Sequence, residues 1–264
     1  MRRFRLTLEY DGAGFAGWQV QPGGTRSVQG ELEAALARIA GHACRAVGAS
    51  RTDAGVHAEG QVASVDLETR LDAEALRRGL CGLLPPDLAV VEAAEVAETF
   101  DARRSARSKL YRYRVWNGAS PSPLRAARTH RVHTPLDLGA MRRAASHLLG
   151  NHDFRSFQAA RSAPGPTVRS LARVDVQGET RGEVAMWVQG DAFLRHMVRI
   201  LAGTLVEVGI GRRDPDSIPA VLAARERSRA GRTAPARGLC LVRVDYAGPG
   251  RIPSPGPGLP GGRP

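Results

Sequence analysis

Cysteine and aromatic residues are scarce in this chain of 264 residues, and lysine is almost missing. The three cysteines, Cys44, Cys81 and Cys240, are far apart and odd in number. This argues against a disulfide framework or a zinc cluster and fits a reducing compartment. No apolar run approaches membrane-spanning length, and no apolar segment follows the basic residues 1–3 as in a signal peptide. We therefore expect a cytoplasmic protein without a membrane partner.

The shortage of lysine makes the charge of the chain unusual. Lys109 is the only lysine among 38 basic residues, against 26 acidic ones, which gives a net charge of +12. We interpret the preference for arginine as codon bias and the positive excess as a sign of an anionic partner. Nucleic acid is the leading candidate, because neutralisation of phosphates by basic side chains dominates such binding.

The pattern of apolar residues predicts an α+β fold made of two similar halves. Residues 1–105 and 106–247 each read as a ferredoxin-like β-α-β-β-α-β unit, with antiparallel strands and helices on one face. Residues 248–264 are almost all Gly, Pro and Arg, and we expect them to be disordered. The elements expected are strands at 4–10, 45–49, 61–67, 88–94, 110–116, 168–177, 183–189 and 239–246, and helices at 27–40, 72–82, 137–149 and 193–208.

The segment 48–58 concentrates reactive side chains in a loop between two of these strands. Gly48 and Gly55 bracket the loop, and Asp53 could act there as a nucleophile or a general base. Arg51 would hold this carboxylate ionised. The alternative is a surface loop carrying a structural Arg–Asp ion pair.

The run Arg51–His57 resembles the catalytic signature of the tRNA pseudouridine synthase A family. Further segments fit the same family in the same order, so the resemblance extends from residue 10 to about residue 246. These segments are YDGAGFAGWQ at 10–19, KLYRYRVWN at 109–117, NHDFRSF at 151–157, AFLRHMVR at 192–199 and TAPARGLCL at 233–241.

The resemblance implies that Asp53 is the catalytic nucleophile of an isomerase that converts uridine to pseudouridine. Attack at the sugar and attack at the base both remain open. The reaction adds and removes nothing, so we expect neither a cofactor nor a metal. A stacked uridine must be flipped out first. Arg51 could then fill the gap, bind a phosphate, or pair with Asp53.

Further site residues are expected in the second half. On the strand 110–116, alternation places Tyr111 and Tyr113 on one face, with Arg112 and Arg114 on the other. The family places Tyr111 in the active site, where we favour contact with the flipped base and leave a proton-transfer role open. Three basic side chains on the helix 193–208 are candidates for contact with tRNA phosphates, opposite its apolar stripe. They are Arg195, His196 and Arg199.

In the resembling family the targets are uridines at positions 38, 39 and 40 of the tRNA anticodon arm, and the enzyme is a homodimer. The leading alternative is a non-catalytic RNA-binding protein or RNA chaperone on the same fold, since fold alone does not establish function. A zinc-dependent base deaminase is weakly suggested by His57-Ala58-Glu59. The deaminase signature needs a following Pro-Cys-x-x-Cys, and this chain has Cys81 alone with no second cysteine nearby.

Overall fold

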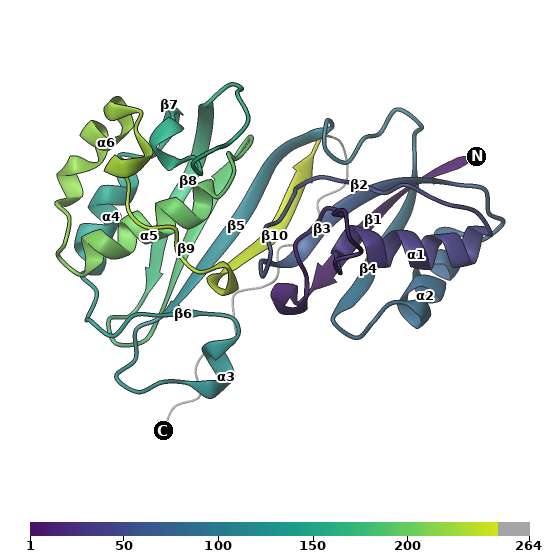
Figure 1. Cartoon of the computed structure of the whole chain (residues 1–264), viewed down its shortest axis with the longest axis horizontal. Helices are drawn as coiled ribbons and strands as arrows, with labels where there is room; N and C mark the ends of the chain where they lie inside the picture. Colours follow the sequence, from purple (N-terminus) through teal and green to yellow (C-terminus); the bar gives the residue numbers. More distant parts are fainter. Residues whose placement is uncertain (248–264) are drawn as a thin grey trace.

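The computed structural model describes residues 1–247, and the expected tail at 248–264 lies outside them. The first half has the strand order β4-β1-β3, with β2 also paired to β3, which is the ferredoxin-like arrangement (Figure 1). Its elements are β1 (Arg2–Tyr10), α1 (Val28–Ala40), β2 (Val47–Gly48), β3 (His57–Leu67), α2 (Ala73–Leu83) and β4 (Leu88–Val96).

The second half repeats this order as β10-β5-β9-β8, extended by β7. Its main elements are β5 (Ala106–Trp116), α4 (Leu138–Ser146), β8 (Val168–Gly178), β9 (Glu183–Gly190), α5 (Met197–Gly209) and β10 (Leu239–Tyr246). Short elements were not expected from the sequence: α3 (Pro123–Ala126), β6 (His130–Arg131), β7 (Gly150–Asp153) and α6 (Ile218–Ala224). The predicted α+β fold with two ferredoxin-like halves is confirmed.

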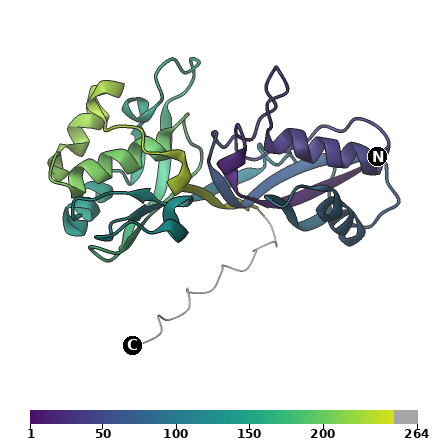
Figure 2. The same cartoon turned by 60° about the horizontal axis from the view of Figure 1, so that its bottom comes forward.

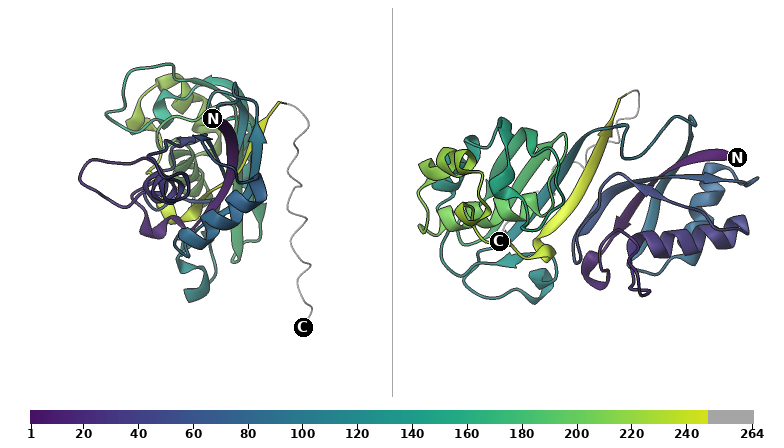
Figure 3. Two further views of the ribbon diagram at one scale, coloured as in Figure 1. Left: turned by 90° about the vertical axis from the view of Figure 1, so that its right-hand side faces the viewer. Right: turned by 45° about the horizontal axis from the view of Figure 1, so that its top comes forward.

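The two halves share one sheet rather than forming two separate sheets. The start of β3 pairs in parallel with β10, through His57 with Cys240 and Ala58 with Leu241. Leu241 also pairs with Tyr111 of β5, so three strands from both halves lie side by side at the junction. Figure 3 shows β10 between the two lobes, and Figure 2 shows α1 and α5 on the same side of the sheet. The segment just before β3 is therefore brought close to Tyr111.

Side-chain caps explain where several helices begin. The Ser27 hydroxyl accepts a hydrogen bond from the Gly30 amide at 3.2 Å. Asp72 does the same for Ala75 at 2.7 Å, and Asp137 for Ala140. Such caps satisfy amides that have no partner in the first helical turn. The predicted starts of these three helices are confirmed by this local chemistry.

Two predicted boundaries near the loop 48–58 were wrong. The strand expected at 45–49 shrinks to β2, and the strand expected at 61–67 extends back to His57. The indole of Trp18 covers Gly48 so closely that a Cβ there would lie 2.4 Å from the ring. The extension of β3 is stabilised by its pairing with β10, which no local pattern could reveal.

The buried tyrosines predict how stability changes at alkaline pH. Burial raises the pKa of all four phenols, Tyr10, Tyr111, Tyr113 and Tyr246, and that of Tyr111 to about 12. Because the folded pKa exceeds the unfolded value of about 10, the stabilisation is complete below pH 10 and lost as pH rises toward 12. We expect tyrosinate absorbance and loss of circular dichroism to rise together. Tyrosinate absorbance with a midpoint near pH 10 in the folded protein would contradict this.

Candidate active site

The loop that carries Asp53 is held by backbone contacts with the segment 10–18. The Trp18 amide donates to the Thr52 carbonyl at 3.0 Å, and the Gly55 amide donates to the Phe15 carbonyl at 3.3 Å. The hydroxyls of Thr52 and Tyr10 share a buried hydrogen bond of 2.8 Å. The motif at 10–19 therefore fixes the loop that presents the carboxylate.

Gly17 makes a close backbone contact within this support. Its φ of +103° is rare for residues with a side chain, and a Cβ would lie 2.7 Å from the Thr52 carbonyl oxygen. We expect Gly17→Ala to displace the Asp53 loop and to lower kcat/KM on the order of 10²-fold, measured by turnover. Gly23→Ala is the matched control, because Gly23 also has positive φ but nothing within 4 Å. Equal activities of the two variants would contradict this role of Gly17.

The Asp53 side chain lines a cavity of about 990 Å³. Residues from both halves of the chain form its walls. Its walls come from the Asp53 loop, from β5, and from the segment before α5 together with the first turn of that helix. All six site residues expected from the sequence line this one cavity: Arg51, Asp53, Tyr111, Arg195, His196 and Arg199.

The charge partner of Asp53 is Arg199, and the predicted pairing with Arg51 was wrong. Arg199 Nη1 lies 3.0 Å from Asp53 Oδ2, and the Asp53 side chain is 25% exposed. Within residues 1–247 Arg51 takes part in no ion pair, and it is exposed at the cavity. Thr52, which separates the two residues, is buried, while Arg51 extends toward solvent. Two of the three roles considered for Arg51 remain, and both are contacts with RNA. Arg51 could fill the gap that the flipped uridine leaves, or it could bind a phosphate.

Arg199 is itself fixed by the motif at 233–241. Its Nε donates to the Ala234 carbonyl at 2.9 Å, and the Ala234 amide donates to the Arg199 carbonyl at 3.0 Å. One guanidinium thus joins Asp53 to a loop from the far end of the chain. Because a planar guanidinium presents donors in fixed directions, it orients the carboxylate as well as neutralising it.

The predicted helix over 193–208 begins later, at Met197. His196 has a left-handed φ of +60°, which interrupts the helical path. Arg195 and His196 therefore lie in the preceding loop, while Arg199 lies in the first turn. The expected common helical face of the three residues was wrong, although all three reach the cavity.

His196 lies beside Asp53 without being its main counter-charge. Its Nε2 is 3.6 Å from Asp53 Oδ2, beyond hydrogen-bonding distance. Burial lowers the pKa of His196, and the neighbouring Arg199 and Arg195 lower it further, against the opposing effect of Asp53. His196 is therefore neutral near pH 7, and Arg199 supplies the positive charge.

Tyr111 forms part of the wall of the cavity that Asp53 also lines. Its hydroxyl lies 2.7 Å from the Ser50 hydroxyl, and its ring meets Phe193 edge-on at 5.0 Å. Burial raises the pKa of Tyr111 to about 12, with a smaller contribution from the negative Asp53. The phenol is therefore protonated at neutral pH, and its ring orientation is fixed. The predicted alternation with Tyr113 buried on the same face is confirmed.

Several cavity residues were missed by the sequence analysis. Ser50 lies within the loop 48–58, but its contact with Tyr111 spans 61 residues. Phe193 lies at the expected start of the helix 193–208, but α5 begins only at Met197. Three basic residues also line the cavity: Arg103, Lys109 and Arg169. The sequence offered a signal only for Lys109, which is the single lysine of the chain.

The histidine of the deaminase-like motif has a structural role. His57 is buried, and its Nδ1 accepts a hydrogen bond from the Gly12 amide at 3.1 Å. Glu59 pairs instead with Arg112 at 2.5 Å. Within residues 1–247 no group of three His, Cys, Asp or Glu side chains could hold a metal ion. In the same residues, no helix is long and apolar enough to span a membrane.

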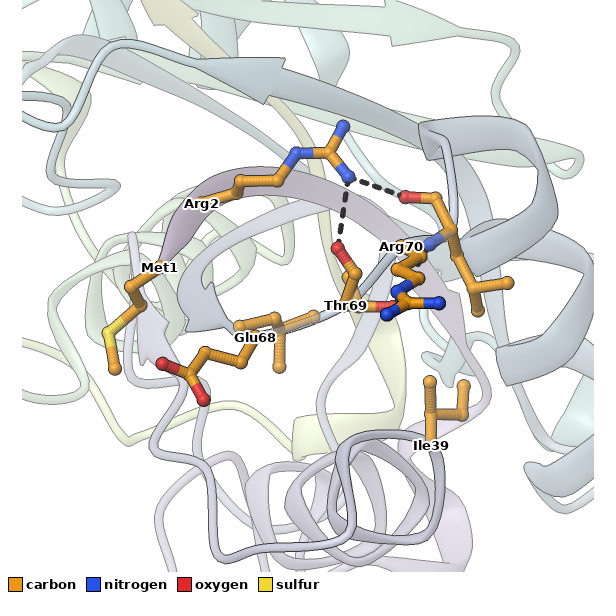
Figure 4. Close-up of a pocket in the computed structure, with 8 residues that line it drawn as sticks. Met1, Arg2, Ile39, Glu68, Thr69 and Arg70 are labelled. Atoms are coloured by element: carbon orange, nitrogen blue, oxygen red, sulfur yellow. Dashed lines mark hydrogen bonds between the residues drawn. The ribbon is translucent and has the colours of Figure 1, made fainter.

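A second depression lies at the far end of the first half, away from Asp53. Arg2 Nη1 donates there to the carbonyls of Thr69 and Leu71, at 3.3 and 2.8 Å (Figure 4). These bonds fasten the start of β1 to the turn after β3. Glu68 is the only carboxylate among the residues that line it. The depression thus lacks the paired reactive groups found around Asp53.

Comparison with known proteins identifies the family. Residues 7–103 and 144–247 match the profile of a family described as tRNA pseudouridine synthase. The chain is 53% identical to tRNA pseudouridine synthase A of Myxococcus xanthus, over 93% of this chain and 92% of that protein. The chain belongs to the tRNA pseudouridine synthase A family.

Other family members are similar over nearly their whole length. The chain is 48% identical to tRNA pseudouridine synthase A of Moorella thermoacetica, over 92% of this chain and 98% of that protein. It is also 48% identical to the enzyme of the same name from Thermus thermophilus, over 93% and 97% of the two chains. The family consists of isomerases, so the chain is an enzyme. The profile covers Asp53 and Arg199, while Tyr111 lies between its two matched ranges.

Proposed function

We propose that this enzyme converts uridines 38, 39 and 40 in the anticodon arm of tRNA to pseudouridine, with Asp53 as the nucleophile. The observation that carries the role of Asp53 is the asymmetry of its carboxylate. Oδ2 is held by Arg199 at 3.0 Å, and within residues 1–247 Oδ1 accepts no hydrogen bond. One oxygen is thus fixed, and the other is available for attack.

The proposed reaction breaks the N1–C1′ bond of uridine and forms a C5–C1′ bond. The C5 proton leaves and N1 gains a proton, so the substrate and product have the same atoms. Tyr111, held by Ser50 and Phe193, offers its ring to the flipped base in the cavity that Asp53 also lines. Arg51, exposed at the cavity, contacts the RNA around the flipped nucleotide. No step of this scheme requires a metal or a redox cofactor.

The site of modification can be mapped on an unmodified tRNA transcript. We expect pseudouridine-specific chemical labelling and primer extension to detect the product only at positions 38, 39 and 40. Transcripts with cytidine at all three positions are the matched control. Modification outside the anticodon arm, or of unrelated RNA to the same extent, would contradict the proposed substrate.

We also propose that the cytoplasmic enzyme acts as a homodimer, with residues 1–105 and 106–247 as the two halves of each subunit. The family resemblance supports this, and two-fold dimers are the commonest oligomers. Sedimentation of the active protein should give twice the chain mass, and dissociation should abolish activity. Full turnover by a verified monomer would contradict the dimer.

A further inference from the structure

The single lysine of the chain lies close to Tyr111 on the wall of the active-site cavity. Lys109 precedes Tyr111 by two residues on β5, and both residues line the cavity. Side chains two apart on a strand point to the same face, about 7 Å from one another. Lys109 is half-buried, and none of the ion pairs within residues 1–247 involves it. Its position therefore places a basic group on the same cavity wall as Tyr111, two residues along β5.

Two arginines beside Lys109 add to this charge. Arg103 and Arg169 line the same cavity. Burial lowers the pKa of Lys109, and both arginines lower it further, against the opposing effect of Asp191. Arg169 Nε is buried and has no hydrogen-bond partner within residues 1–247. Arg103 is exposed, while Lys109 and Arg169 are half-buried. The buried Nε of Arg169 has a desolvation cost that a bound anion would offset.

The neighbouring carboxylate does not neutralise the cluster by direct pairing. Asp191 lines the same cavity, but its Oδ1 accepts hydrogen bonds from the amides of Ser170 and Ala192, at 3.2 and 2.6 Å. It therefore fixes the turn after β9. The positive groups of Lys109, Arg103 and Arg169 remain available to a ligand that enters the cavity.

We propose that Lys109, Arg103 and Arg169 bind the backbone phosphate next to the uridine whose base lies on Tyr111. This inference rests on the proposed function, and it assigns these three residues as substrate-positioning residues. A flipped nucleotide carries its phosphate on the ribose next to its base, and Lys109 lies next to Tyr111 on the same wall of the cavity. A compact ammonium with arginines around it suits a phosphate that must be held without stacking.

A thermodynamic cycle between protein and RNA tests the contact. Single methylphosphonate linkages, which are uncharged, are placed 5′ or 3′ of the target uridine in a ligated full-length tRNA. We expect Lys109→Met to raise Kd for unmodified tRNA about tenfold and to lower the salt slope by about one. One of the two linkages should raise the wild-type Kd by a similar factor and cause a clearly smaller loss in Lys109→Met, where the two arginines still contact the phosphate. Additive losses at both linkages, or an unchanged Kd, would overturn the proposal.

Two control variants test whether a loss of binding comes from the charge at this site or from the lower net charge of the protein. Lys109→Arg keeps the charge and should stay close to wild type, while Arg78→Met removes one exposed charge on α2, outside the cavity. Equal weakening by Arg78→Met would contradict a specific site. If Lys109→Met does not fold, Arg169→Met should give the same non-additivity with the same linkage.

Turnover by the wild type distinguishes this inference from the proposed function. Tritium release from tRNA together with additive losses in the cycle would overturn the phosphate site alone. Non-additive losses without tritium release would support the phosphate site and overturn the isomerisation.

Discussion

Asp53→Asn should lower kcat on the order of 10⁴-fold or more while tRNA binding changes little. The amide keeps the size of the carboxylate but cannot attack as a nucleophile. Arg199 would still face an oxygen in place of Oδ2. The loop also keeps the hydrogen bond from the Trp18 amide to the Thr52 carbonyl. Kinetic assays on a tRNA transcript, together with measured Kd values, check this expectation.

The matched control is Asp66→Asn. Asp66 lies on β3, the strand that follows the Asp53 loop. Asp66 accepts two hydrogen bonds from Arg3, at 2.7 and 2.6 Å, on the surface of the sheet. Exposed ion pairs contribute about 0–1 kcal/mol, so turnover should stay at the wild-type level. Substantial turnover by Asp53→Asn would refute its assignment as nucleophile, and loss of tRNA binding would give Asp53 a binding role instead.

Arg199→Lys should have the second largest effect, a fall in kcat on the order of 10²-fold. Arg199 reaches Asp53 through Nη1 and the Ala234 carbonyl through Nε, which a single ammonium cannot reproduce. The charge beside Asp53 is kept, so the loss measures orientation of the carboxylate. Steady-state kinetics should show the change mainly in kcat rather than in KM.

Arg213→Lys provides a control with the same kind of geometry. Arg213 also joins a carboxylate, Glu207 at 3.1 Å, to a backbone carbonyl, that of Arg229 at 3.0 Å, but it does not line the cavity. Both variants should lose comparable thermal stability, and only Arg199→Lys should lose turnover. Equal turnover of the two variants would contradict the orienting role of Arg199.

Local chemistry in the sequence was sufficient to predict much of the fold. The caps at Ser27, Asp72 and Asp137 follow from side chains that satisfy nearby amides. The alternation around Tyr111 predicted the buried face of β5. The left-handed φ of His196 was not predictable, because apolar periodicity continues through Phe193 and nothing local marks the break.

The arrangement of the site depends on contacts that local patterns do not contain. Asp53 and Arg199 are 146 residues apart, and they meet because β3 pairs with β10. From the sequence, Arg51 was the nearest available charge, so pairing with Asp53 was one of the three roles considered for it. Family resemblance brought Arg199 into the site, and the shared sheet determined which arginine holds the carboxylate.

Tritium release from C5-tritiated uridine in an unmodified tRNA transcript tests the central claim most directly. The assay is run with a chelator and without added cofactor, comparing wild type with Asp53→Asn. The account predicts release by the wild type, with label lost from the anticodon arm, and none by the variant. Tight tRNA binding by the wild type without any release would contradict the isomerase and favour an RNA-binding protein on the same fold.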